Sequence, residues 1–310
     1  MRRPLKVIIA FTLLILVYFT IQLLRHTLFL SGSIVEDVMM HQDLPADLNF
    51  GGEPFPHSKD IARHAIGDEI KKLKNNKAST TLLLERANQW LPAIEAILLK
   101  ENIPQDFEFL PIIESGLTNS ESSQDAAGYW QLVSETGRYY GLEINDSIDE
   151  RYNVLKSTEA ACKYLHESYA HFHNWTLVAA SYNSGINGIA AAMDRQGKSD
   201  FFSLELNDET TNFIYRILAA KTVIRNADLY GFKPIGSTYY PKLIFKKVCV
   251  DSSITHLEMF ANRYNCSIQD IKLLNPWILG HGLTNTSKKK YSLFVLNSTI
   301  KDFEYPLIGL

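Results

Sequence analysis

The spacing of apolar residues predicts a mainly α-helical core over residues 60–230. Apolar residues recur there every three or four positions, and no stretch alternates convincingly with period two. Such spacing places apolar side chains on one face of a helix. We therefore expect helices over residues 82–100, 107–115, 175–183 and 208–229, and one more that begins at an N-cap on Ser157.

The pattern changes after residue 234. Residues 243–250 and 291–296 are rich in β-branched and aromatic side chains, which favour strands. Residues 257–264 and 268–274, which lie between them, have the spacing of short helices. The order strand–helix–helix–strand predicts a small, separate α+β module at the C-terminal end.

The N-terminal segment contains a long apolar run. Residues 7–24 carry no charge, and at ~1.5 Å per residue a helix of this length spans about 27 Å, enough for a hydrocarbon core. Arg2, Arg3 and Lys6 precede the run, which favours a cytoplasmic N-terminus and export of the rest. We predict an uncleaved membrane anchor, with a cleaved signal peptide as the alternative.

Charge and cysteine content exclude several classes of protein. The formal net charge is −3, and the first 30 residues hold four basic and no acidic side chains, so the remainder is more acidic still. Nucleic-acid binding needs a basic surface, so we expect none. Three cysteines are too few for a disulfide framework, although Cys249 and Cys266 could pair in an oxidising compartment. We expect no cofactor and no metal, since His166, His171 and His173 do not share a helix face.

Glu114 is the candidate acid. It ends the apolar run 109–113, and Gly116 is expected to stop the helix that contains it. Apolar surroundings disfavour the charged carboxylate and raise its pKa. A carboxyl group that is still protonated near neutral pH can protonate a leaving-group oxygen. From this residue alone, an ordinary acid at a helix end remains the alternative.

Four segments occur in a characteristic order. They are Glu114-Ser115-Gly116, residues 128–131 (GYWQ), residues 180–185 (ASYNSG) and residues 209–213 (ETTNF). In this order they resemble the lytic transglycosylase core of glycoside hydrolase family 23, most closely its membrane-bound D type. The resemblance covers about residues 80–230 and continues through residues 149–151, 156–158 and 163–165.

The resemblance implies a lysozyme-like fold and one catalytic carboxyl group. Glu114 would protonate the oxygen between N-acetylmuramic acid and N-acetylglucosamine of peptidoglycan. It would then accept the proton of the muramic C6 hydroxyl, which closes on C1 and forms a 1,6-anhydro end. A hydroxyl held against C1 has an effective molarity of up to ~10⁵ M or more, which explains how the site avoids hydrolysis.

The resemblance also implies a set of residues that bind the substrate. Ser115 and Gln131 would line the sugar site, and Tyr182 and Asn183 would position the acetamido group and Glu114. Tyr129 belongs either to the core or to a sugar platform. Phe213 departs from the family, which has a tyrosine there; the ring is kept and the hydroxyl is lost, which would lower activity.

Other residues near these segments have simpler interpretations. We predict that Trp130 belongs to the core. Most glycosidases need two carboxylates, and four further acids are candidates for a second one. We interpret Glu121 and Asp125 as solvated loop residues, and Asp149 and Glu150 as ion-pair partners around Arg151.

The C-terminal module resembles a LysM domain. The resemblance rests on residues 259–264 and 271–276, while the usual Gly-Asp-Thr opening is missing. A LysM-like module would tether the enzyme to glycan and raise the local substrate concentration. Packing of the module against the core, without glycan binding, is the alternative.

The expected organisation has four parts: an anchor or signal segment over residues 1–30, a linker and helical extension over 31–80, a lysozyme-like lytic transglycosylase domain over 81–235, and a divergent LysM-like module over 236–310. We expect an enzyme of the cell envelope, anchored in the inner membrane with its catalytic domain in the periplasm, or secreted after signal cleavage. Its partners would be peptidoglycan strands and, through residues 7–24, the membrane. Two alternatives for its activity are a hydrolysing muramidase and a peptidoglycan-binding scaffold with an impaired site.

Overall fold

The computed structural model describes residues 20, 22, 44–45, 48–56, 60–236 and 245–296. The chain forms two compact units, Met1–Ala46 and Asp47–Leu310. The predicted anchor lies outside the described residues, apart from two positions. Within the described part of the chain, no helix has the length and apolar character needed to cross a membrane.

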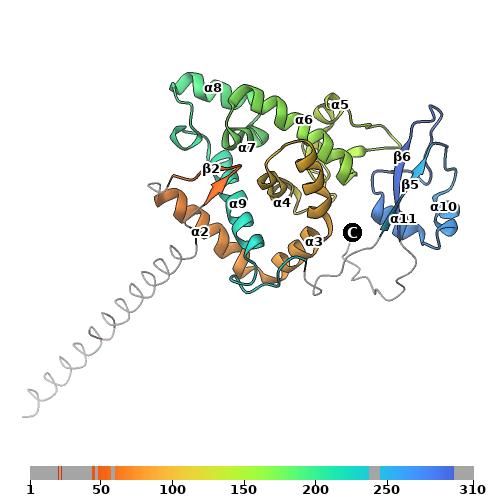
Figure 1. Cartoon of the computed structure of the whole chain (residues 1–310), viewed down its shortest axis with the longest axis horizontal. Helices are drawn as coiled ribbons and strands as arrows, with labels where there is room; N and C mark the ends of the chain where they lie inside the picture. Colours follow the sequence, from red (N-terminus) through yellow and green to blue (C-terminus); the bar gives the residue numbers. More distant parts are fainter. Residues whose placement is uncertain are drawn as a thin grey trace, which may run out of the picture. The chain divides into compact units, whose positions relative to one another are not determined.

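Helices make up most of the region between residues 60 and 236 (Figure 1). This agrees with the predicted mainly α-helical core. The helices are α2 (Asp60–Asn75), α3 (Lys77–Lys100), α4 (Leu110–Ser115), α5 (Ser134–Tyr139), α6 (Val154–Phe172), α7 (Trp175–Ser184), α8 (Ile186–Gln196) and α9 (Asp208–Arg225). Three short 3₁₀ turns, η1 (Gln105–Phe109), η2 (Glu150–Tyr152) and η3 (Phe201–Ser203), and two short strands, β3 (Ala126–Ala127) and β4 (Leu132–Val133), connect them.

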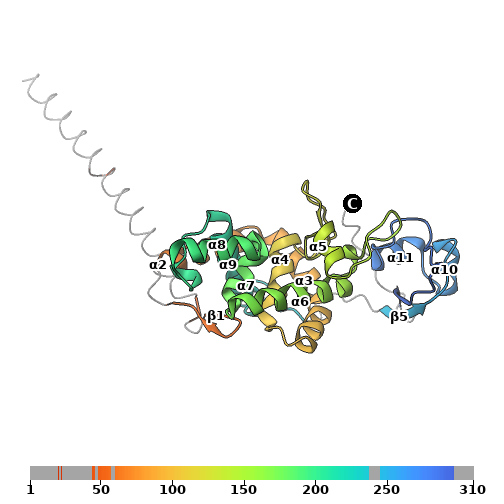
Figure 2. The same cartoon turned by 90° about the horizontal axis from the view of Figure 1, so that it is seen from above.

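Helix α9 organises the packing around α4. It contacts α2, α4 and α7, and α4 lies among the other helices in both views (Figure 1 and Figure 2). Asn207 caps α9 by accepting a hydrogen bond of 2.7 Å from the backbone N–H of Thr210. Phe213, Ile214 and Ile217 are buried at helical spacing, so α9 is a core helix.

The predicted helix over residues 107–115 consists of two pieces, η1 and α4. Pro111 occupies the first turn of α4, where a missing N–H costs nothing. Gly116 ends the helix with a φ of 60°, a left-handed conformation that suits glycine. The predicted stop at Gly116 is confirmed, and Glu114 lies in the last turn of the helix.

The predicted cap on Ser157 is wrong. Helix α6 begins one turn earlier, and the side chain of Asn153 accepts hydrogen bonds from the backbone N–H groups of Leu155 and Lys156. Ser157 is buried inside the helix and donates a hydrogen bond of 2.8 Å to the carbonyl of Asn153. Serine makes such bonds to the preceding turn when it lies within a helix.

Part of the predicted linker is an ordered hairpin, formed by β1 (Asn49–Phe50) and β2 (Glu53–Pro54). The carboxylate of Glu53 accepts hydrogen bonds from the backbone N–H groups of Trp175 and Thr176 and from the Thr176 hydroxyl. A carboxylate at the first turn of α7 accepts hydrogen bonds from otherwise unpaired N–H groups, and its negative charge interacts favourably with the positive end of the helix dipole. The hairpin is therefore attached to the helical core.

The C-terminal module has the predicted βααβ order. It comprises β5 (Phe245–Val250), α10 (Leu257–Arg263), α11 (Ile268–Leu274) and β6 (Tyr291–Leu296), and its two strands pair antiparallel. Its hydrophobic core includes Leu257, Ile271 and Leu293. Cys249 and Cys266, which could have formed a disulfide, are both free.

Candidate active site

Glu114 lies at the centre of the candidate site and is half-buried in the last turn of α4. Burial raises the pKa of its carboxyl group to about 7, in the direction that the apolar run predicts. The positive charge of Arg216 opposes this rise, and the negative charge of Glu209 adds to it. Glu114 can therefore carry its proton close to neutral pH.

Arg216 and Glu209 both come from α9. They are seven residues apart, which places them on one face of the helix, two turns from each other. The guanidinium of Arg216 also donates a hydrogen bond of 3.1 Å to the carbonyl of Ile113. Neither residue was predicted to act on Glu114, although their spacing places both on one helix face.

Tyr182 extends from α7 toward the same site. Its hydroxyl donates a hydrogen bond of 2.7 Å to the carbonyl of Trp130. The pKa of Tyr182 lies well above its usual value because the ring is buried and because the charge of Glu114 acts on it. The structure thus brings Glu114 and Tyr182 together, as the resemblance implies.

Ser115 directly follows Glu114, and Gln131 lies two residues after Tyr129, in the loop that Ser115 contacts. The Ser115 hydroxyl lies 2.8 Å from the carbonyl oxygen of Tyr129, which links the end of α4 to the following loop. Gln131 has a left-handed backbone with a φ of 48°. Its side-chain N–H₂ donates hydrogen bonds of 2.9 Å to the carbonyls of Ser120 and Gly128. These bonds hold Gln131 in a defined position within its loop.

Asn183 connects α7 to the start of α9. Its side-chain carbonyl accepts a hydrogen bond of 2.8 Å from the Thr210 hydroxyl, and its N–H₂ lies 3.4 Å from a carboxylate oxygen of Glu209. Asn183 and Glu209 are thereby linked directly, and the charge of Glu209 in turn acts on Glu114.

Three aromatic residues of the motifs are buried. Tyr129 is 4% exposed and Phe213 is 2% exposed, so neither presents a ring face for a sugar in this structure. Trp130 is fully buried, and its indole N–H donates a hydrogen bond of 2.8 Å to the Thr158 hydroxyl. The prediction that Trp130 belongs to the core is confirmed.

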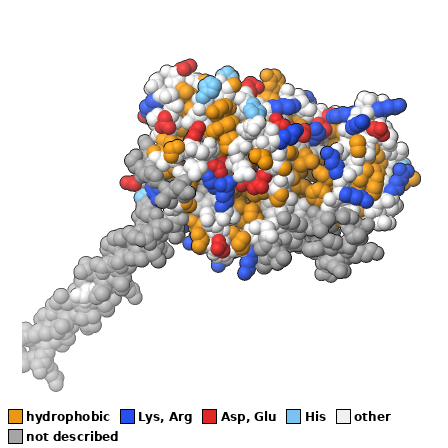
Figure 3. Space-filling view, in the orientation of Figure 1, with side chains coloured by type: hydrophobic (Ala, Val, Ile, Leu, Met, Phe, Trp, Pro, Cys, Tyr) orange, Lys and Arg blue, Asp and Glu red, His pale blue; other side chains and the backbone are white. Residues whose placement is uncertain are grey.

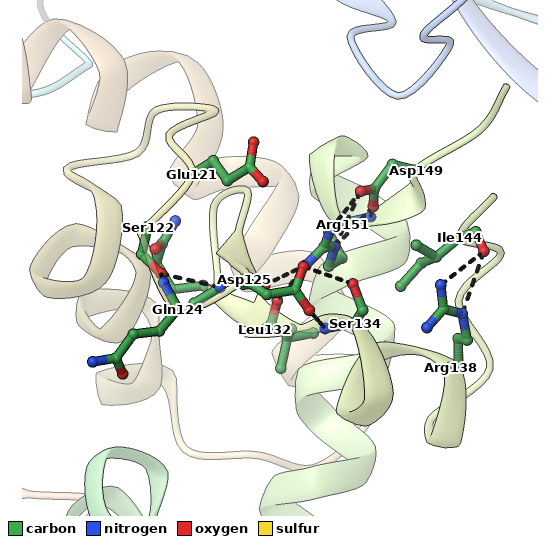
Figure 4. A network of polar contacts seen from close by, with 12 residues as sticks. Glu121, Ser122, Gln124, Asp125, Leu132, Ser134, Arg138, Ile144, Asp149 and Arg151 are labelled. Carbon is green, nitrogen blue, oxygen red and sulfur yellow. Dashed lines mark hydrogen bonds and ion pairs between the residues drawn. The ribbon is translucent and has the colours of Figure 1, made fainter. Parts of the chain in front are cut away.

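The acids considered as a second carboxylate differ in their surroundings. Asp149 forms the expected ion pair with Arg151, at 2.7 Å. Asp125, expected to be a solvated loop residue, also pairs with Arg151 and accepts hydrogen bonds from the backbone N–H and hydroxyl of Ser134 (Figure 4). Asp125 is nevertheless exposed on its loop, as expected, and Arg151 reaches it from a later segment. Glu121 lies on the same loop, outside the bonds drawn in Figure 4.

Glu150 was predicted to pair with Arg151, but its partners are different. Its carboxylate accepts a hydrogen bond of 2.8 Å from the backbone N–H of Glu143 and lies 3.6 Å from the ammonium of Lys289. Asp149 and Glu150 therefore both have structural partners. The acidic group whose charge raises the pKa of Glu114 is Glu209. Across the described residues, no group of three or more His, Cys, Asp or Glu side chains is placed to hold a metal ion.

The two parts of the chain match two known domain families. Residues 92–204 match the family described as Transglycosylase SLT domain, and residues 246–299 match the Soluble lytic transglycosylase C-terminal LysM-like domain. The chain therefore contains an SLT domain followed by a LysM-like domain. The resemblances found in the sequence are confirmed for both domains.

Curated relatives extend this result. The chain is 33% identical over 224 residues to the membrane-bound lytic murein transglycosylase D of Escherichia coli strain K12, and equally to that of strain CFT073. The match covers 70% of this chain and 49% of each relative, so the chain spans about half the length of the curated relatives that it matches. Among solved structures, the lytic transglycosylase Slt of Pseudomonas aeruginosa is 20% identical, with 48% of this chain and 26% of that chain covered and a TM-score of 0.35.

Proposed function

We propose that this protein is a peptidoglycan lytic transglycosylase that remodels the cell wall. The observation that carries the proposal is the state of Glu114, a half-buried carboxyl group with a pKa of about 7 in the last turn of α4. A general acid works best when its pKa lies near the working pH. The names of the curated relatives and the SLT domain support the same reaction class.

In the proposed first step, Glu114 gives its proton to the glycosidic oxygen between N-acetylmuramic acid and N-acetylglucosamine. The bond between this oxygen and C1 of the muramic residue breaks, and positive charge develops at C1. The acetamido group of the substrate stabilises that charge, so a second carboxylate is not needed. The carboxylate form of Glu114 remains.

In the second step, the C6 hydroxyl of the same sugar attacks C1 and gives its proton to Glu114. A 1,6-anhydro end forms, no water is consumed, and the acid is regenerated. We assign Ser115, Gln131, Tyr182 and Asn183 to substrate binding and to the positioning of Glu114. Their support is the order of the motifs and the hydrogen bonds that join Ser115 to Tyr129 and Tyr182 to Trp130, the two residues before Gln131. Tyr129 and Phe213 would shape this site from beneath, since both are buried.

A hydrolysing muramidase is the second candidate, and Glu209 is the observation that favours it. Its carboxylate is exposed and acts electrostatically on Glu114. A second carboxylate near the acid is the arrangement that activates water or stabilises the sugar cation in many glycosidases. The two reactions differ in their products, because hydrolysis leaves each new end heavier by one water molecule.

Digestion of purified sacculi tests both candidates. The full chain in detergent is incubated with sacculi, and the released fragments are weighed by mass spectrometry. We expect 1,6-anhydro ends, and none from Glu114→Gln. Ends that carry an added water would establish the muramidase. If sacculi are bound equally by the parent chain and Glu114→Gln and neither releases sugar, the chain is a binding protein without catalysis.

We further propose that the protein works in the cell envelope. Residues 7–24 would anchor it in the inner membrane, with residues 81–235 and 236–310 in the periplasm, unless the segment is cleaved as a signal peptide. The apolar run, the preceding basic residues and the membrane-bound relatives support this arrangement. Its partner would be the glycan strand, held by the SLT domain and by the LysM-like module.

A further inference from the structure

The C-terminal module is joined to the SLT domain by backbone pairing. Residues 143–152, which we call the docking loop, connect α5 to α6. The N–H of Asp149 donates a hydrogen bond of 2.9 Å to the carbonyl of Trp277, and the N–H of Leu279 donates one of 3.0 Å to the carbonyl of Ser147. Between these bonds, Ile148 forms an antiparallel bridge with Ile278. The docking loop thus pairs with the module as a short strand would.

One side chain of the docking loop belongs to the hydrophobic core of the module. Ile148 is 1% exposed and packs in the same cluster as Leu257, Trp277 and Leu293. Burial of an isoleucine side chain removes apolar surface from water and so stabilises the contact. Separating the module from the docking loop would expose this side chain, so the module does not behave as a body on a free tether.

Charge also favours this contact. Residues 245–296 contain seven Lys and Arg against three Asp and Glu, and blue side chains are frequent over the module in Figure 3. The docking loop is acidic. The ammonium of Lys289 lies 2.6 Å from a carboxylate oxygen of Glu143 and 3.6 Å from one of Glu150. The hydroxyl of Tyr291 donates a second hydrogen bond to Glu143, at 2.9 Å.

The docking loop also contacts the loop that contains Gln131, through Arg151. Residues 120–134, which we call the site loop, receive hydrogen bonds from the guanidinium of Arg151 at the carbonyls of Asp125 and Leu132 (Figure 4). The side chain of Arg151 is 5% exposed. The backbone of Arg151 also lies against Gly128, where an added Cβ would come within 2.0 Å of the Arg151 carbonyl oxygen. The site loop therefore follows any displacement of the docking loop.

We infer that the C-terminal module is a brace for the candidate active site: by holding the docking loop, it keeps the site loop and Gln131 in their working position. Lys289 and Ile148 are then positioning residues, and the module contributes to turnover as well as to any binding of glycan. The kinetic part of this inference rests on the proposed function. The structural part does not.

The charge reversal Lys289→Glu tests the brace in the full chain in detergent, because it turns two attractions into repulsions. We expect amide hydrogen exchange in residues 120–134 to become about tenfold faster. On a short soluble glycan, kcat should fall about tenfold with KM within a factor of two, since small displacements of positioned groups mainly cost turnover. Lys290→Glu makes the same charge change on the neighbouring exposed side chain and should alter neither quantity.

Faster exchange confined to the module, with unchanged exchange in residues 120–134, would overturn the inference. Ile148→Ala provides a second variant that acts through packing rather than charge, and it should produce the same pattern. If the parent chain releases no sugar, the proposed function fails, and exchange alone decides the brace. Unchanged exchange in residues 120–134 of both variants then rejects it, and faster exchange in both supports it.

Discussion

The hydroxyl of Tyr182 donates a hydrogen bond of 2.7 Å to the backbone carbonyl of Trp130. This bond joins α7 to the residue that directly precedes Gln131, whose backbone is left-handed. Tyr182 also lies close enough to Glu114 for the charge of the carboxylate to raise the pKa of its phenol, in addition to the effect of burial. Tyr182 thus lies near the candidate acid and is bonded to the loop that contains Gln131.

We expect Tyr182→Phe to lower kcat on sacculi about tenfold and to reduce the free energy of unfolding by about 1–3 kcal/mol, because a buried carbonyl loses its partner. Tyr164→Phe is the matched control, since Tyr164 packs against Tyr182 but donates its hydrogen bond to the carbonyl of Ser181 instead of to the loop that contains Gln131. The control should lose stability to a similar degree and keep kcat. Equal losses of kcat in both variants would show that Tyr182 acts through stability alone.

The two charges on α9 should move the pH profile in opposite directions. In the proposed mechanism protonated Glu114 is the active acid, so kcat/KM should be retained below its pKa of about 7 and should fall as pH rises above it. Glu209→Gln removes the charge that raises this pKa, which shifts the fall to lower pH. Arg216→Gln removes the charge that lowers it, which shifts the fall to higher pH. Each shift should be about half a pH unit, because both side chains are exposed.

The salt dependence of these shifts provides their control. Interactions between exposed charges are screened at high ionic strength, so both shifts should shrink in about 1 M salt. The measurement is kcat/KM from pH 5 to 9 at low and high salt. Shifts of the same sign in the two variants would contradict the electrostatic assignment, because a general disturbance of the site has no reason to follow the sign of the lost charge.

Glu114→Gln should abolish activity and stabilise the protein at alkaline pH. The pKa of Glu114 rises from 4.5 to about 7 on folding, so the folded state holds the proton more tightly and stability falls as pH rises from about 4.5 to 7. At pH 8 the buried carboxylate costs on the order of 1–3 kcal/mol, which the neutral amide avoids. Thermal unfolding at pH 4 and pH 8 measures this difference. A variant that is no more stable than the parent at pH 8 would contradict the raised pKa.

Local patterns were sufficient to predict most elements of the fold. Helix α11 and strand β6 have their predicted bounds. The helix begins where predicted because Ser267 and Asp270 form a reciprocal capping box. The predicted start of α6 was wrong because Asn153 and Ser157 are one turn apart and both residue types are common N-caps. Sequence alone does not decide between such neighbours, because the choice depends on where the preceding chain turns.

The candidate site was predictable in part. The apolar run before Glu114 indicated the direction of its pKa, because the buried neighbours are adjacent in sequence. Arg216 and Glu209 act from a helix about one hundred residues later, and Asp125 is held by Arg151 across the site loop. These pairings depend on packing between distant segments, which periodicity and capping do not report.

The hairpin at residues 49–54 should depend on one buried ion pair. Asp106 accepts a hydrogen bond of 2.8 Å from the backbone N–H of Gly51 and pairs with the ammonium of Lys221 at 2.7 Å, and both charged side chains are largely buried. Asp106→Ala leaves a buried charge without its carboxylate, which typically costs about 3–5 kcal/mol. Asp68→Ala breaks the exposed pair with Lys71 and should change stability by less than about 1 kcal/mol. Guanidinium unfolding followed by tryptophan fluorescence measures both, and because Gly51 packs against Trp175, loss of the hairpin should also change the emission of the folded state.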